Sequence, residues 1–120
     1  MLLDSVIVID CLNRIPSALD FVRAQTVRPS VSLVTWAEVF AGVSPAGEAD
    51  TRRYLGAFRL LPLDQAIAER AGRLRQSERW KLPDALQAAT AQHHGLQLVT
   101  RNTKDFKPER HPFVVVPYTI

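Results

Sequence analysis

The sequence has little of several features that would narrow its function at once. It contains a single cysteine, Cys11, so no internal disulfide can form and nothing in the fold depends on an oxidising compartment. Its apolar runs, such as 6–9 and 114–116, are far shorter than the roughly 20 residues of a membrane span. Asp4 also excludes the basic start of a signal peptide. We therefore expect a cytoplasmic protein with no membrane partner.

Glycine is also scarce, with only five residues in the chain. Neither the glycine-rich dinucleotide fingerprint nor the Walker phosphate loop occurs, which argues against a nucleotide-binding α/β protein. There is no internal repeat, low-complexity segment or linker. We therefore expect residues 1–120 to form one domain.

What the sequence does contain fits a globular domain of basic character. Of its 120 residues, 47% are hydrophobic and 22% are charged, and 15 Lys and Arg outnumber 12 Asp and Glu. Most of the basic residues are Arg, whose planar guanidinium matches phosphate oxygens in a bidentate fashion. Composition therefore suggests a polyanion such as nucleic acid as a partner.

Short apolar runs alternate with helical patterns along the whole chain. The near-continuous apolar character of these runs favours strands that are covered on both faces. We therefore predict an α/β fold, a three-layer α/β/α sandwich around a mainly parallel sheet of about five strands. Strands are expected near 1–3, 31–34, 59–63, 96–99 and 114–117, and helices near 5–14, 16–25, 35–42, 48–58, 64–79 and 83–94.

Four carboxylates, Asp4, Glu38, Asp84 and Asp105, lie where a strand-like run gives way to a helix or loop. In parallel sheets the ligand crevice lies outside the carboxyl ends of the strands. Asp4, the Thr35–Glu38 turn and the loop that holds Asp105 should gather there, and Asp84 joins them from the start of its helix. The acids are far apart in sequence, so only the fold can bring them together.

Each acid also has a simpler structural explanation. Asp4 could cap the first helix, and Thr35 and Glu38 have the spacing of a capping box. Asp84 would favour the helix dipole after Pro83, and Asp105 could be an ordinary loop acid. Helix caps do not explain why all four acids fall on one edge of one sheet.

A cluster of carboxylates needs a counter-charge. Two carboxylates about 4 Å apart repel by roughly 4 kcal/mol at an effective dielectric of about 20. A divalent cation removes that cost, and oxygen ligands without Cys or His select Mg²⁺ or Mn²⁺ over zinc. Such a site suits phosphodiester hydrolysis without a covalent protein intermediate.

The strings LLDS, TWAEVFAG, LPDALQAATA and TRNTKDF, in this order and spacing, resemble the PIN-domain ribonucleases and specifically the VapC toxins. The similarity covers nearly the full chain, and the last two strings together are its most specific part. It implies a Mg²⁺- or Mn²⁺-dependent endoribonuclease, held inactive by a VapB-type antitoxin encoded beside it. It also implies an RNA substrate, usually transfer or ribosomal RNA, and a homodimer.

By position, Asp4, Glu38 and Asp84 match the three most regular acids of that family, and Asp105 matches a more variable fourth. We expect Asp4 and Asp84 to bind the metal directly. Glu38 is expected to bind it through water or to orient the attacking water. Asp105 is expected to serve a second metal or to support the others. All four are candidate catalytic and metal-binding residues.

Four further residues are candidates for supporting the site or contacting substrate. Ser5 and Asn102 match polar positions that assist the acids in the family. Ser5 is a small departure, because Thr is common there. Arg101 and Lys104 flank the expected site and are the best candidates for contacts with RNA.

Some chemically capable residues are expected to have other roles. Asp10 should be a solvated charge that points away from the site, and His111 should be a surface loop residue. Trp36 is expected to pack, whereas the role of Trp80 stays open. The competing function is a non-catalytic RNA- or protein-binding module of the same fold, although a pure binder has no need for four repelling acids.

Overall fold

A computed structural model describes all residues from 1 to 120. Its centre is a five-stranded sheet with the strand order β3-β2-β1-β4-β5, and every neighbouring pair is parallel. The mainly parallel sheet predicted from the sequence is thus confirmed. The strands are β1 (Leu2–Leu3), β2 (Ser30–Ser32), β3 (Arg59–Leu61), β4 (Leu98–Val99) and β5 (Val114–Val115).

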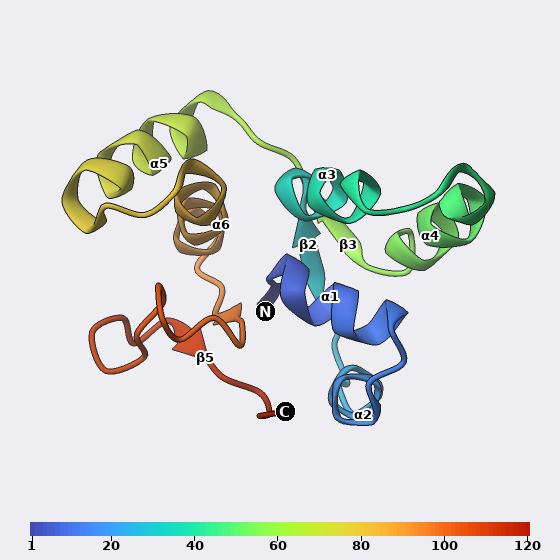
Figure 1. Cartoon of the computed structure of the whole chain (residues 1–120). Helices are drawn as coiled ribbons and strands as arrows, with labels where there is room; N and C mark the ends of the chain where they lie inside the picture. The colour runs from blue at the N-terminus through green and yellow to red at the C-terminus, as the bar shows by residue number, and fades with distance from the viewer.

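Six α-helices flank this sheet. In Figure 1, α5 and α6 lie together on one side of the molecule, whereas α1, α2, α3 and α4 lie on the other. No helix combines the length and apolar character required to cross a bilayer. The helices are α1 (Ser5–Leu12), α2 (Pro16–Arg23), α3 (Leu33–Ala41), α4 (Glu48–Leu55), α5 (Gln65–Glu78) and α6 (Leu82–His93), with a short 3₁₀ turn η1 (Pro45–Gly47) before α4.

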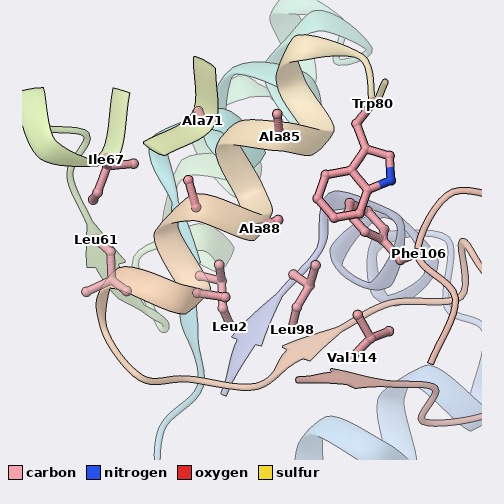
Figure 2. Packing of buried hydrophobic residues seen from close by; sticks show 12 residues of the cluster. Leu2, Leu61, Ile67, Ala71, Trp80, Ala85, Ala88, Leu98, Phe106 and Val114 are labelled. Atoms are coloured by element: carbon pink, nitrogen blue, oxygen red, sulfur yellow. The ribbon is translucent and has the colours of Figure 1, made fainter. Parts of the chain in front are cut away.

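Side chains of the strands alternate between two hydrophobic clusters. Leu2, Leu98 and Val114 belong to the cluster beneath α5 and α6, and Figure 2 shows them in a row below α6. The next residues, including Leu3 and Val99, belong to the cluster beneath α1, α3 and α4. Because successive residues of a strand face opposite sides of the sheet, even two-residue strands serve both cores.

Small residues let α6 lie close to both α5 and the sheet. Ala85, Ala88, Ala89 and Ala91 have no exposed surface, and Ala71 of α5 is equally buried. A small side chain at a contact allows two helices to approach closely, because interaxial distance depends on the residues between them. The position of α6 matters because Asp84 lies in its first turn.

The second strand starts and ends earlier than predicted. Residues 31–34 were expected to form it, but the strand is Ser30–Ser32 and the helix begins at Leu33. The hydroxyl of Ser32 accepts a hydrogen bond from the Thr35 amide at 3.3 Å, so Ser32 is the N-cap of α3. The predicted capping box of Thr35 and Glu38 is therefore wrong, because both residues lie inside the helix. The predicted strands at 59–63, 96–99 and 114–117 are each also shorter in the structure.

Candidate functional site

Asp4 is the central residue of the candidate site, at the carboxyl end of the middle strand. It is the N-cap of α1, and its carboxylate accepts a hydrogen bond from the Ser5 amide at 2.9 Å. Two side chains also donate to it, the Thr100 hydroxyl at 2.7 Å and the Gln87 amide at 3.3 Å. The capping explanation is correct but incomplete, because a cap alone does not need two further donors from distant segments.

Burial and hydrogen bonding act in opposite directions on Asp4. Only 5% of the residue is exposed. Burial raises the pKa of its carboxyl group, and the hydrogen bonds from Thr100, Ser5 and Gln87 partly offset that rise. A carboxylate in such a place is stabilised further by any cation that binds to it.

Glu38 approaches the site from the second turn of α3. Its carboxylate accepts a hydrogen bond from the Ser5 hydroxyl at 2.9 Å. Partial burial raises the pKa of Glu38, the Ser5 hydrogen bond opposes this, and repulsion from Asp4 adds to it. Ser5 thus bridges the first two acids, donating from its amide to one and from its hydroxyl to the other.

The pKa of Asp84 is influenced by all three of the other acids. It follows Pro83 in the first turn of α6, and its carboxylate makes no hydrogen bond or ion pair within the chain. Burial raises the pKa of Asp84 to about 6, with further contributions from the negative charges of Asp4, Asp105 and Glu38. The fold therefore brings the other three predicted acids within electrostatic range of Asp84.

Asp105 is held by the loop that follows β4. The Asn102 side chain donates to its carboxylate at 3.0 Å and accepts a hydrogen bond from its amide at 3.3 Å. The backbone amide of Asn102 in turn donates to the Thr100 hydroxyl at 3.0 Å, and that hydroxyl donates to the Asp4 carboxylate. One chain of hydrogen bonds therefore connects the outer acid to the central one.

The donor set fits a hard divalent cation in its chemistry. All four groups are carboxylates, and Asp84 forms no ion pair in the chain, although the charge of Lys81 partly offsets the repulsion from the other acids. As the side chains stand, no three Asp, Glu, His or Cys residues are close enough to hold one ion. Glu38 and Asp105 are exposed. Their side chains are therefore free to turn toward a cation without repacking the core.

Arg101 and Lys104 differ in where their side chains go. Arg101 donates from Nε and Nη2 to Asp10 at 2.7 and 2.9 Å, and the Tyr118 hydroxyl donates to the same carboxylate at 2.8 Å. Asp10 was predicted to be a solvated charge, but only 6% of this residue is exposed, so that prediction is wrong. Its partners are 91 and 108 residues away, so no local pattern around Asp10 indicates them. Lys104 is exposed at the rim of the site.

Gln87 contacts the site and was not found from the sequence. This side chain has no exposed surface, and its amide donates to Asp4 and, at 2.6 Å, to the Thr35 hydroxyl. The Ser32 hydroxyl donates back to its carbonyl oxygen at 2.7 Å. Gln87 is three residues after Asp84 and is one of two side-chain amides, with Gln92, in an alanine-rich helix, which was the available sequence signal. Thr100, directly after β4, was another.

Trp80 and His111 pack together beside Asp105. Trp80 is 5% exposed, and its indole Nε1 donates to the Asp105 carbonyl oxygen at 2.9 Å. The ring centroids of Trp80 and His111 are 5.0 Å apart, and His111 Nε2 lies 3.0 Å from a Glu78 oxygen. His111 is in a loop, as predicted, but it is less exposed than a surface residue, because this stack leaves only 15% of its side chain accessible. Trp36 stacks on Phe40, as a packing role requires.

The chain is similar to known proteins over nearly its whole length. Residues 1–108 match the PIN domain family. Over 113 aligned residues the chain is 36% identical to Ribonuclease VapC10 of Mycobacterium tuberculosis, and the match covers 88% of this chain and 85% of that protein.

Solved structures agree with this relationship. A toxin–antitoxin complex from Klebsiella pneumoniae contains a chain that is 43% identical, with a TM-score of 0.91 and coverage of 99% of this chain and 98% of that one. FitAcB from Neisseria gonorrhoeae, at 22% identity and a TM-score of 0.80, covers 99% of both chains and supports the fold alone. The chain thus belongs to the PIN domain family and is one of its VapC-type members.

Proposed function

We propose that this chain is the toxin of a type II toxin–antitoxin pair and that it hydrolyses RNA phosphodiester bonds with Mg²⁺ or Mn²⁺. One observation carries the proposal. The Asp84 carboxylate has no cationic partner in contact and lies near three other acids, which together with burial raise its pKa to about 6. The name of the related Ribonuclease VapC10 supports the same activity.

The four acids would have different roles in hydrolysis. A divalent cation supplies a hydroxide from water at neutral pH and stabilises negative charge on the phosphate. Asp4 and Asp84 would hold the cation directly, and Glu38 would orient the attacking water. Asp105 would hold a second cation or support the other three acids.

Hydrogen bonds already in the structure would keep these groups in position. Ser5 donates to Glu38, and Asn102 donates to Asp105. Thr100 and Gln87 fix the two oxygens of Asp4 from different segments. Such outer contacts orient the ligands of metal sites and affect their affinity for the ion.

A VapB-type antitoxin is the proposed inhibitor. Structures similar to this chain come from a toxin–antitoxin complex of Klebsiella pneumoniae and from VapBC assemblies of Rickettsia felis and Salmonella typhimurium. We propose that a segment of the cognate antitoxin covers the acidic site. Transfer or ribosomal RNA in the cytoplasm is the proposed substrate.

An exposed apolar surface supports the proposed homodimer. Leu33, Leu63 and Leu82 are 40%, 36% and 49% exposed, and with Pro83 they line a shallow apolar pocket that reaches Glu38. Clustered apolar side chains on a surface are typical of protein contacts. A second copy bound here would lie next to the acidic site of the first.

Cleavage of total cellular RNA by the purified, antitoxin-free protein tests the nuclease. We expect discrete new ends with Mg²⁺ or Mn²⁺ and none with EDTA. Asp84→Asn should abolish cleavage. Asp20→Asn is a matched control, because Asp20 is an exposed acid of α2 outside the site.

The same assay separates the enzyme from its alternative. Circular dichroism would establish that each variant is folded. Metal-dependent ends that persist in folded Asp84→Asn protein would contradict the assignment of the site. Tight RNA binding without cleavage at any metal concentration would favour the non-catalytic binding module instead.

A further inference from the structure

A polar pocket adjoins the acidic site and shares Asp105 with it. It has a volume of about 270 Å³ and lies between the end of α5 and the loop that carries Asp105. Asp105 and Lys104 line it, so the pocket begins where the acidic site ends. Its volume is sufficient for several water molecules, or for one ionic group together with some of its water.

Positive charge dominates the lining of this pocket. Arg79, Lys104 and Lys107 are exposed there, and none of them forms an ion pair in the chain. The fourth cation, Arg110, donates to Glu78 at 3.0 and 3.3 Å. Glu78 is therefore already neutralised, and three cations remain against one carboxylate, Asp105, so the pocket keeps an excess of positive charge.

The backbone that carries these cations is fixed by buried contacts. Trp80 packs on Phe106 with ring centroids 5.0 Å apart, and Figure 2 shows the two rings against each other. Nη1 of Arg75 donates to the Trp80 carbonyl oxygen at 2.7 Å. Both aromatic residues are neighbours of pocket residues in sequence, Trp80 of Arg79 and Phe106 of Lys107. The cations therefore extend from an ordered base, which reduces the entropy lost when they bind a ligand.

We propose that this pocket binds a backbone phosphate of the RNA strand next to the phosphate that is cut. The inference rests on the proposed nuclease function and extends it to a subsite for substrate. Lys104, Lys107 and Arg79 would neutralise that phosphate and release its counterions. An acidic peptide would fit the charge equally well, but continuity with the acidic site favours a strand that passes through both.

The positive charge of the subsite would offset the repulsion between the acidic site and RNA. The four acids repel an RNA strand unless cations cover them. Positive side chains beside them hold the next phosphate independently of the metal. The pocket would thus contribute to affinity and to the register of the strand, and it would add no group to the reaction itself.

The test measures RNA binding by an inactive protein. Fluorescence anisotropy of a labelled single-stranded RNA with Asp84→Asn protein gives the reference affinity. We expect Lys107→Ala or Arg79→Ala in this background to weaken binding about three- to tenfold and to lower the slope of log affinity against log salt by about 0.7. Arg28→Ala is the matched control, because Arg28 is exposed and precedes β2, at the opposite end of the strands.

RNA length and a competing ligand make the test specific. The pocket variants should bind an RNA decamer more weakly than the reference protein does. They should bind a dinucleotide as well as the reference protein does, because a dinucleotide is too short to reach both the acidic site and the pocket. Equal effects of Lys107→Ala and Arg28→Ala would overturn the subsite. So would an oligoglutamate peptide whose binding requires Lys107 while RNA binding does not.

The outcomes also separate this inference from the proposed function. If the wild-type protein cuts RNA, and Lys107→Ala and Arg79→Ala proteins that keep Asp84 bind and cut RNA as well as it does, only the subsite fails. If folded protein with an intact site neither binds nor cuts RNA, the nuclease proposal fails and the subsite fails with it.

Discussion

Arg101 and Asp10 form a bidentate ion pair that ties the loop after β4 to the first helix. Their nitrogen and oxygen atoms are 2.7 and 2.9 Å apart, and 8% of the Asp10 side chain is exposed. Tyr118 donates to the same carboxylate, so the C-terminal segment is joined to it as well. The pair lies next to Thr100 and Asn102, which organise Asp4 and Asp105.

Loss of this ion pair should destabilise the protein. We expect Asp10→Ala to lower the free energy of unfolding by about 2 kcal/mol, because Arg101 and Tyr118 then lose a charged partner in a largely buried place. Urea denaturation followed by circular dichroism measures the change. Asp50→Ala is the control, because it breaks an exposed pair with Arg53 and should cost less than about 0.5 kcal/mol. Equal losses in the two variants would contradict the structure.

The contribution of Asp10 should depend on pH in a defined direction. Burial tends to raise its pKa, but hydrogen bonds from Arg101 and Tyr118 outweigh burial and lower the pKa below its ordinary value of 3.8. The folded protein then binds fewer protons on this group than the unfolded chain does. The stability that Asp10 contributes is therefore fully present at pH values above 3.8, its ordinary pKa. It is lost as the pH falls through the lower pKa that Asp10 has in the folded protein.

The measurement compares wild type with Asp10→Asn across pH. The difference in their free energies of unfolding should be constant from about pH 7 to about pH 5 and should narrow as the pH is lowered toward 3 and below. A difference that widens with acid would mean that the pKa of Asp10 is raised.

Gln87 should act on metal affinity as well as on stability. We expect Gln87→Leu to weaken Mn²⁺ binding about 10- to 100-fold, because it removes a donor that orients Asp4. Isothermal titration calorimetry on the folded variant measures this without relying on catalysis. Thr90→Val is the control, since the Thr90 hydroxyl is buried in the same helix but donates only to the Leu86 carbonyl oxygen. Equal Mn²⁺ affinities in the two variants would reduce Gln87 to a packing residue.

A substitution far from the site should stabilise the protein. Gly72 is in the exposed part of α5, and a Cβ added there meets no atom within 4 Å. Gly72→Ala should raise the free energy of unfolding by about 0.5–1 kcal/mol, because alanine loses less backbone entropy in a helix. At Gly56 the added Cβ would lie 3.3 and 3.4 Å from the carbonyl oxygens of Arg52 and Arg53. Gly56→Ala should therefore raise the free energy of unfolding by less than Gly72→Ala does. Thermal unfolding of the wild type and both variants measures the two changes in stability.

The sequence predicted the layers and the acids because these depend on local pattern. Asp4 and Asp84 stand at the ends of apolar runs or helix starts, and parallel strands bring such positions to one edge. The exact end of β2 could not be predicted in the same way. Ser30 and Ser32 are buried polar residues of the strand, and Ser32 is paired with Gln87, 55 residues further on.

Residues whose roles depend on distant partners were the ones that local pattern missed. Asp10 looks like a surface acid until Arg101 is placed against it. Gln87 looks like a helix residue of no special kind until the sheet brings Asp4, Thr35 and Ser32 around it. In each case the partner is more than 50 residues away, and no periodicity of the chain encodes that distance.

The middle strand of the sheet is formed by residues 2 and 3, whereas its neighbour β4 is formed by residues 98 and 99. During synthesis the first of these emerges from the ribosome long before the second. The Asp4 carboxylate then has neither Thr100, which is 96 residues later, nor Gln87 to hold it. A ribosome that has made most of this chain therefore carries an unassembled site. The four acids can come together only near the end of translation, once the segment that holds Thr100 and Asp105 has been made.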